Sequence, residues 1–248
     1  MKILVCISHV PDTTAKINFT SDSSALDGNG IQFVINPYDE FGLTKALQLK
    51  EKHGGTVTVV TYGDTRVEQT LRKALAIGAD DAVRLDGIPT DPMQVAGELA
   101  AHVQSAGYDL VICGQESIDY NGGIVPGALA AHLDWAFVNA CIGLTLEGQQ
   151  ADCLREMDGG KEAVKATLPM VIAGKKGLVE ESELRIPNMR GIMTARTKPL
   201  IPQPLAGTTP ASHPASFTKP APKAAVQLID SSNLEELVRR LHEEAKVI

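Results

Sequence analysis

The stretch TVTVVTYGDTRVEQTLRKALAIGADDAVRL (residues 56–85) contains a complete strand–helix–strand unit. Its first part, TVTVVTY (56–62), consists of β-branched and aromatic residues, as is typical of a strand buried on both faces. Apolar residues from Val67 to Leu75 then recur at helical spacing, and DAVRL (81–85) predicts the next strand. Because such a unit joins parallel strands through a right-handed crossover, it predicts a parallel sheet covered by helices.

The same alternation continues on both sides of this unit. The runs ILVCI (3–7) and DLVICG (109–114) are typical of buried strands, and Pro37 can begin a helix after the extended segment 32–36. The sequence therefore predicts an α/β fold with an open, mostly parallel sheet and helices on both faces. We expect helices near residues 38–53, 65–78, 91–106 and 122–133.

The pattern changes after Trp135. Several extended segments between residues 137 and 173, the last of them MVIAG (170–174), are separated by glycine-containing turns. We expect these segments to add antiparallel strands to the sheet.

The C-terminal region has a different composition from the rest of the chain. Six prolines lie between residues 201 and 222, which predicts an extended linker or arm. The final segment predicts an amphipathic helix with an apolar stripe that includes Leu234, Leu237 and Val238. Its stripe can be buried against its own domain or against a partner. We therefore divide the chain into an α/β nucleotide-binding domain (1–200) and a proline-rich arm ending in a helix (201–248).

Composition excludes several classes of protein. The net charge of −7 argues against a nucleic-acid-binding protein, which usually has a basic face. The four cysteines are widely spaced and indicate buried thiols in a reducing compartment. The sequence contains no run of about 18 apolar residues, so we expect no membrane-spanning segment. We expect a cytoplasmic protein.

The loop GQESIDYNGG (114–123) is the main candidate for a ligand site. It follows a predicted parallel strand and precedes a helix, where open α/β sheets bind ligands. A simple turn is an equally good interpretation, because neither a P-loop nor a G-x-G-x-x-G motif is present. The strand ends at Cys6 and Tyr62 can face the same crevice. No nucleophile–base pair can be recognised, which favours a binding or carrier protein over an enzyme.

A second candidate is the segment ELRIPNMRGIMTARTKPL (183–200). It places large apolar residues among arginines, and it lies outside the strand–helix repeat. A flexible methionine in such a setting suits a docking surface, although the same residues can instead pack on the domain.

Six passages, in the same order, resemble the beta subunit of electron-transferring flavoproteins. The passage REMDGGKEAVKATLPMVIA (155–173) resembles the signature of this family almost throughout, although Cys153 replaces the usual valine just before it. Together the passages cover nearly all of residues 1–200. The other five are VCISHVPD (5–12), VINPYDEFGLTKALQLKE (34–51), TLRKALAIGADDAVRL (70–85), GQESIDYNGGIVPGALAAHLDW (114–135) and RIPNMRGIMTARTKPL (185–200).

The resemblance implies a sheet of the adenine-nucleotide-binding type and a function. A beta subunit pairs with an alpha subunit that holds most of an FAD. The heterodimer passes electrons from dehydrogenases, such as an acyl-CoA dehydrogenase, to a quinone reductase or similar acceptor. The resemblance places Tyr38 near the partner's flavin and Met189 on the exposed residue that recognises dehydrogenases, with Ile186, Ile192 and Met193 beside it. The implied crevice residues are Cys6, Asn36, Tyr62, Ser117, Asp119, Gly123, Ile124 and Val125.

The sequence departs from the family in the crevice loop. Ile124-Val125-Pro126 replaces a polar run, and Pro126 has no amide donor. Tyr120 replaces a glycine that is typical of members with a second FAD. We therefore expect the crevice to hold AMP or nothing, rather than a second FAD.

Two other interpretations remain open. One is a stand-alone adenine-nucleotide-binding module, of stress-protein or ATP-pyrophosphatase type. The pyrophosphatase would need an S-G-G-x-D-S loop after the first strand, where this chain has SHVPDT (8–13). The other is an interaction scaffold without a nucleotide.

Overall fold

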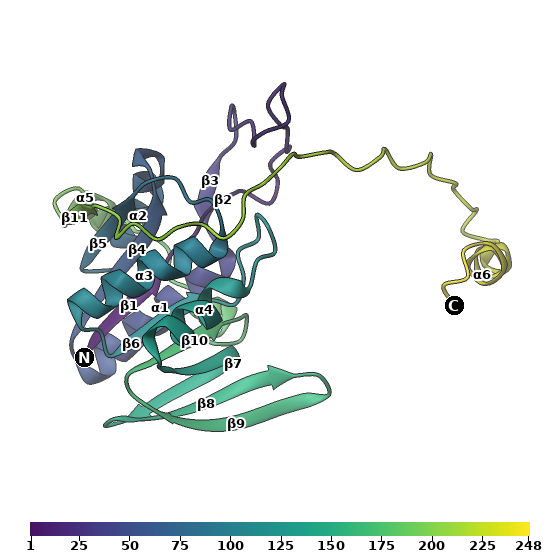
Figure 1. Cartoon of the computed structure of the whole chain (residues 1–248). Coiled ribbons are helices and arrows are strands. Elements are labelled where there is room, and N and C mark those ends of the chain that lie inside the picture. The colour runs from purple at the N-terminus through teal and green to yellow at the C-terminus, as the bar shows by residue number, and fades with distance from the viewer.

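The computed structural model describes residues 1–248 and contains a nine-stranded sheet with a separate two-stranded ribbon (Figure 1). The strand order β11-β5-β4-β1-β6-β10-β7-β8-β9 confirms the predicted open α/β sheet. All neighbours from β11 to β7 are parallel, whereas β8 and β9 are antiparallel additions. The strands are β1 (Lys2–Cys6), β4 (Thr56–Gly63), β5 (Asp81–Asp86), β6 (Leu110–Gly114), β7 (Ala136–Glu147), β8 (Gln150–Met157), β9 (Gly160–Thr167), β10 (Met170–Gly174) and β11 (Leu200–Gln203), with β2 (His9–Pro11) and β3 (Phe33–Ile35) in the ribbon.

The helices cover both faces of the sheet and create two cores. Along β1, the buried Ile3 and Val5 point into a cluster with α1 and α2, while Leu4 points into a cluster with α3 and α4. This alternation is what a strand buried on both faces requires. No helix is both long and apolar enough to cross a bilayer. The main helices are α1 (Pro37–His53), α2 (Glu68–Ile77, preceded by the short η1, Thr65–Val67), α3 (Pro92–Ala106) and α4 (Ile124–Leu133), followed by the short η2 (Glu181–Glu183), α5 (Met189–Ala195), α6 (Leu234–Arg239) and η3 (Arg240–Glu244).

Two strands after Trp135 differ from the expectation that they are antiparallel additions. Strand β7 is antiparallel to β8 but parallel to β10, so it belongs to the parallel part of the sheet. The segment MVIAG forms β10, which lies between β6 and β7 and is parallel to both, so its assignment to the antiparallel additions was wrong. All five of its residues are buried. A short run that is apolar at every position is typical of a central parallel strand, whereas the alternating burial along β8 marks a strand with one solvated face.

The proline-rich segment begins as part of the domain. Leu200–Gln203 forms the edge strand β11, parallel to β5. The residues that follow cross α3, where the buried carboxylate of Glu98 accepts backbone hydrogen bonds from Ala206 (2.6 Å), Gly207 (2.9 Å) and Thr208 (2.6 Å). We call residues 204–212 the strap. Prediction from composition overlooked this strap because its anchor is a single carboxylate on a distant helix.

Beyond the strap, the chain extends away from the domain and ends in α6 (Figure 1). Its last contacts with the domain include the stacking of Phe217 on Phe19, whose ring centroids are 5.2 Å apart. On α6, Leu234, Leu237 and Val238 are 64%, 40% and 55% exposed. The apolar stripe of this helix is therefore not covered by its own domain.

Candidate functional site

The candidate site lies at the carboxyl ends of β1, β4 and β6, where the strand order reverses. The chain leads from β1 to β4 and β5 on one side, and then crosses back through α3 to β6 on the other side of β1. In open α/β sheets, such a switch point leaves a crevice between the loops that diverge from neighbouring strands. The predicted residues Cys6, Tyr62 and Ser117 lie at or just beyond these strand ends.

The first turn of α1 ties the crevice loops together. Asn36, the residue preceding this helix, is fully buried. Its Nδ2 atom donates to the carbonyl oxygen of Glu116 (2.8 Å), and its Oδ1 atom accepts from the amide of Ile118 (3.3 Å). Asn36 therefore fixes the path of the loop that follows β6, as an amide side chain with both a donor and an acceptor can.

Asp39, one turn further along, makes a second set of contacts. One carboxylate oxygen accepts from the amide of Ser8 (2.7 Å) and the other accepts from the amide of Gly114 (2.9 Å). The helix approaches β6 so closely that a Cβ atom at Gly114 would lie 2.2 Å from Asp39 Oδ1. Only glycine fits at that position without a shift of the helix.

A cavity of about 1250 Å³ opens beside these loops. Tyr62 and Asp119, both predicted crevice residues, contribute to its wall. The cavity has mainly apolar and aromatic walls, and Arg66 is the only lysine or arginine that lines it. Its aromatic side chains are Phe19, Phe33, Tyr62, Tyr120 and Phe217, together with the imidazole of His9.

The surroundings of His9 and Asp64 in the cavity wall fix their protonation states near pH 7. His9 stacks on Phe33, with ring centroids 4.4 Å apart, and its Nδ1 atom lies 2.7 Å from Thr70 Oγ1. Burial, with a smaller contribution from Arg66, lowers the pKa of His9. The ion pair with Arg66 (2.8 Å) lowers the pKa of Asp64 and keeps it charged. The histidine is therefore neutral near pH 7, while Arg66 is partly neutralised by Asp64.

The loop between β6 and α4 closes on itself. The backbones of Ser117 and Gly122 form a pair of hydrogen bonds (3.0 and 3.2 Å), and the hydroxyl of Ser117 donates to Asp119. Tyr120, at the tip of this loop, is 69% exposed. The predicted Gly123, Ile124 and Val125 lie at the start of α4, where Ile124 is 54% exposed and Val125 is half-buried.

The walls of the cavity fit an adenine nucleotide. Aromatic and apolar walls suit the flat faces of a purine ring, and a few polar groups then fix its orientation. The Oε1 atom of Gln115, directly after β6, is buried and has no hydrogen-bond partner, but Gln115 is not among the residues that line the cavity.

The predicted recognition segment contains the short helix α5 (Met189–Ala195). Asn188 caps it by accepting from the amide of Gly191 (2.7 Å). Helix α5 lies so close to α2 that a Cβ atom at Gly191 would be 2.2 Å from the carbonyl oxygen of Ala76. Of the four predicted recognition residues, Ile186, Met189 and Met193 are 80%, 76% and 67% exposed, and Ile192 is 44% exposed.

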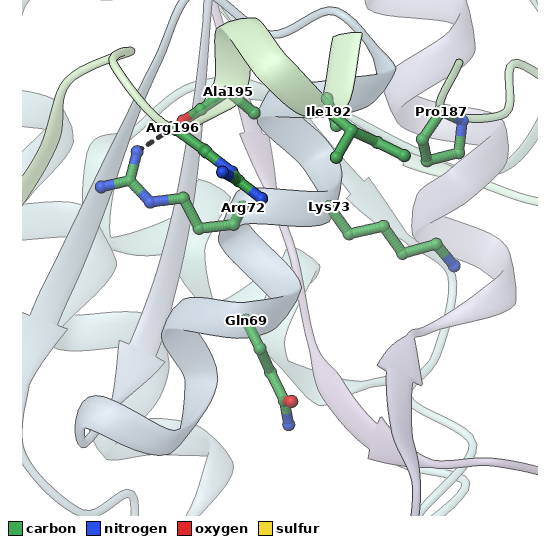
Figure 2. Close-up of a pocket in the computed structure, with 8 residues that line it drawn as sticks. Gln69, Arg72, Lys73, Pro187, Ile192, Ala195 and Arg196 are labelled. Carbon is green, nitrogen blue, oxygen red and sulfur yellow. Dashed lines mark hydrogen bonds between the residues drawn. The ribbon is translucent and has the colours of Figure 1, made fainter. Parts of the chain in front are cut away.

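A basic pocket of about 630 Å³ lies between α2 and α5 (Figure 2). Arg72 Nη1 donates to the carbonyl oxygens of Ala195 (2.7 Å) and Lys198 (2.8 Å), which fastens the end of α5 to α2. Lys73 lines the same pocket and forms an ion pair with Glu40 (3.1 Å). The exposed apolar residues are thus presented on a rigid base with positive charge nearby.

Sequence reasoning overlooked two residues of the site, Asp39 and Gln115. In the sequence, Asp39 stands in the expected first turn of a helix, where an exposed carboxylate is common because it interacts favourably with the helix dipole. Only its burial and its contacts with two separate strand ends distinguish it. For Gln115, the one available signal was its place directly after a buried strand.

Comparison with known proteins identifies related chains. A sequence model described as "Electron transfer flavoprotein domain" matches residues 25–206. The chain is 34% identical to "Electron transfer flavoprotein subunit beta" of Bacillus subtilis (strain 168), with 100% of both chains covered. It is also 32% identical to the protein of that name from Bradyrhizobium diazoefficiens, again over 100% of both chains, and 34% identical to that from Syntrophomonas wolfei, over 91% of this chain and 88% of the relative.

Proposed function

Because the chain belongs to the electron transfer flavoprotein family, as one of its beta subunits, we propose that it carries electrons only in a heterodimer whose alpha subunit holds most of an FAD. The heterodimer would accept electrons from dehydrogenases and pass them to a quinone reductase or a similar acceptor. The resemblance to beta subunits implies an alpha-subunit partner. The division of the flavin between the chains, and the donors and acceptors, are our proposal.

The exposed stripe of α6 is the observation that carries this proposal. Three large aliphatic residues, Leu234, Leu237 and Val238, face solvent on a helix at the end of an extended arm (Figure 1). An amphipathic helix gains most of its stability by burying such a stripe, so this helix needs a covering surface. The alpha subunit is the partner that we propose for it.

Tyr38 is the residue that we propose to approach the flavin of the partner. It is half-buried at the carboxyl edge of the sheet, between the two α1 residues that fix the crevice loops. Burial and the nearby Glu116 raise the pKa of Tyr38, so its phenol is neutral and can act as a hydrogen-bond donor. When bound, the flavin would supply the electron-transfer chemistry, while this chain would supply a rigid, partly apolar surface beside it.

For the crevice, we propose AMP rather than a second FAD as the ligand. The aromatic walls of the cavity suit one adenine moiety. Arg66 is the only arginine or lysine in the cavity wall and is paired with Asp64, so the cavity offers little positive charge for a pyrophosphate. Tyr120 is bulky at the rim, where a second flavin would have to enter.

We further propose that the segment around α5 docks dehydrogenases. Ile186 and Met189 are its most exposed large apolar residues, and a flexible thioether adapts to different pockets. Neither Arg190 nor Arg196 takes part in an ion pair within the chain. Unpaired arginines at the rim would speed encounter with an acidic partner surface.

Co-expression of this chain with an FAD-binding alpha subunit tests the proposal. The copurified complex should be yellow, with one FAD released per heterodimer on denaturation, and a dehydrogenase should reduce it. The chain purified alone should be nearly colourless. Stoichiometric FAD on the isolated chain, or a failure of the two chains to copurify, would contradict the proposed division of roles.

A further inference from the structure

Asp39 occupies an unusual position for a carboxylate. It is 2% exposed, and it lies where the first turn of α1 meets the ends of β1 and β6. Its two oxygens accept from amides on two different loops, that of Ser8 after β1 (2.7 Å) and that of Gly114 at the end of β6 (2.9 Å). A single side chain therefore joins the two loops whose divergence creates the crevice.

The contacts of Asp39 continue through the backbone into the loops beside the cavity. Gly114 leads into the loop that Asn36 holds, and Ile118 and Asp119 of this loop line the cavity. On the other side, Ser8 is followed by His9, which lines the cavity. Loss of either Asp39 contact would free one of these loops to move relative to the other.

No nearby cation holds Asp39 in its charged form. Burial raises the pKa of Asp39 to about 7, although the amides of Ser8 and Gly114 and the side chains of Asn36 and Ser8 oppose this shift. The neighbouring titratable groups are the thiols of Cys113 on β6 and Cys6 on β1. Hydrogen bonding with Cys6, together with burial, raises the pKa of Cys113, so this thiol is neutral. Tyr38 on α1, Glu116 on the loop after β6 and Lys175 after β10 interact with one another, and none of them shifts the pKa of Asp39.

We propose that Asp39 is a positioning residue that holds the two crevice loops in their nucleotide-binding arrangement when ionised and releases one of them when protonated. This inference rests on the proposed adenine-nucleotide site. A carboxylate accepts both amides strongly, whereas in a carboxylic acid the protonated oxygen is an uncharged, weaker acceptor that also carries a donor, so its contact with the amide is weakened. The crevice should therefore bind nucleotide more tightly above neutral pH than below it.

The size of the effect follows from the ionised fraction. With a pKa of about 7, about ten-elevenths of Asp39 is ionised at pH 8 and about one-eleventh at pH 6. Apparent affinity scales with the fraction of binding-competent protein, so the dissociation constant should rise about tenfold from pH 8 to pH 6. Because the phosphate of AMP itself titrates near pH 6, adenosine serves as a second probe without that group.

The experiment uses the full-length chain freed of nucleotide. Calorimetric titration with AMP and with adenosine at pH 6, 7 and 8 should give the tenfold change for both ligands. In Asp39→Asn the change should shrink to less than about twofold, with weak binding throughout. In parallel, the amide shifts of Ser8 and Gly114, measured by NMR without ligand, should titrate with a midpoint near pH 7 in the wild-type chain but not in Asp39→Asn.

The matched control is Asp109→Asn. Asp109 Oδ2 accepts from the amide of Lys2 (2.7 Å), so it joins the same two strands, β1 and β6, at their opposite ends. This variant should lose a comparable contact yet keep the tenfold pH dependence. Binding that is independent of pH in the wild-type chain would overturn the proposal. Amide shifts that titrate in a chain that binds neither ligand would instead refute the nucleotide site, while supporting the clamp between the loops.

Discussion

Replacement of Glu98 by glutamine should loosen the strap without disturbing the rest of the sheet. The Glu98 carboxylate is 2% exposed, and it is the acceptor for three consecutive strap amides, those of residues 206–208. Gly207 and Thr208 donate to one oxygen, and Ala206 donates to the other. In Glu98→Gln, one oxygen remains as a neutral acceptor, while the new NH₂ group faces the amide of Ala206.

The magnitude follows from the strength of these bonds. A hydrogen bond to a charged group contributes about 1.5–3 kcal/mol, and a neutral one contributes about 1 kcal/mol. One charge-assisted bond is lost and two are weakened. Detachment of the strap into solvent limits the damage, because its freed amides can then bind water. We expect the free energy of unfolding to fall by about 2–3 kcal/mol.

The pH dependence gives an independent check. Burial acts to raise the pKa of Glu98, but the strap amides outweigh it, so the pKa of the folded state lies below the ordinary value. A carboxylate with a lowered pKa stabilises the fold fully above its unfolded pKa of about 4.3, and this contribution is lost as the pH falls through the folded pKa. The difference in stability between wild type and Glu98→Gln should therefore be constant from pH 6 to 8 and shrink below about pH 4.

Urea unfolding measures the stability change, and hydrogen exchange locates it. Amides 206–208 should lose protection in Glu98→Gln, while those of β1 and β4 should keep it. The control is Glu147→Gln, an exposed carboxylate at the end of β7, which should change stability by less than about 0.5 kcal/mol. Unchanged protection of the strap in Glu98→Gln, or a loss of stability no larger than in the control, would refute the reasoning.

Three further predictions concern the partner surfaces. Ile186→Ala and Met189→Ala should each slow reduction of the heterodimer by its dehydrogenase, because loss of a buried anchor costs about 2 kcal/mol or more of binding free energy. Reduction by dithionite and the FAD content should stay normal. A rate of reduction by the dehydrogenase equal to that of wild type in both variants would exclude docking through this segment. Leu237→Asp should weaken pairing with the alpha subunit, as measured by copurification, without changing the melting temperature of the isolated chain. Removal of residues 213–248 should act in the same direction and leave the strap in place, and normal pairing of this truncated chain would assign the arm another role.

The sheet could be predicted well from sequence because its strands carry their own signal. Runs such as ILVCI are apolar at every position, and the helices between them have a clear apolar face. The position of MVIAG after a hairpin suggests an antiparallel strand, whereas its uniformly apolar run suits the central parallel strand β10 that it forms. Its parallel neighbours, β6 and β7, are fixed by the whole topology rather than by any local pattern.

The candidate site was predictable only in outline. Strand ends indicated where a crevice should form, and Tyr62 and Asp119 do line the cavity. Sequence did not indicate that Asn36 is fully buried, with its amide engaged by the loop after β6. It also did not reveal Phe217 in the cavity wall, because this residue lies in a segment whose composition indicated only a linker.

Two buried carboxylates in this chain accept hydrogen bonds from backbone amides, but their pKa values shift in opposite directions. Glu98 and Asp39 are each 2% exposed, and each accepts backbone amides from distant segments. Glu98 is covered by the strap, whose residues Ala206 and Gly207 are themselves exposed, so the amides prevail and its pKa is lowered. Asp39 lies between two central strands and a helix, so the cost of burying its charge prevails and its pKa rises to about 7. The strap is therefore fastened throughout the neutral range, whereas the contact between the crevice loops responds to pH.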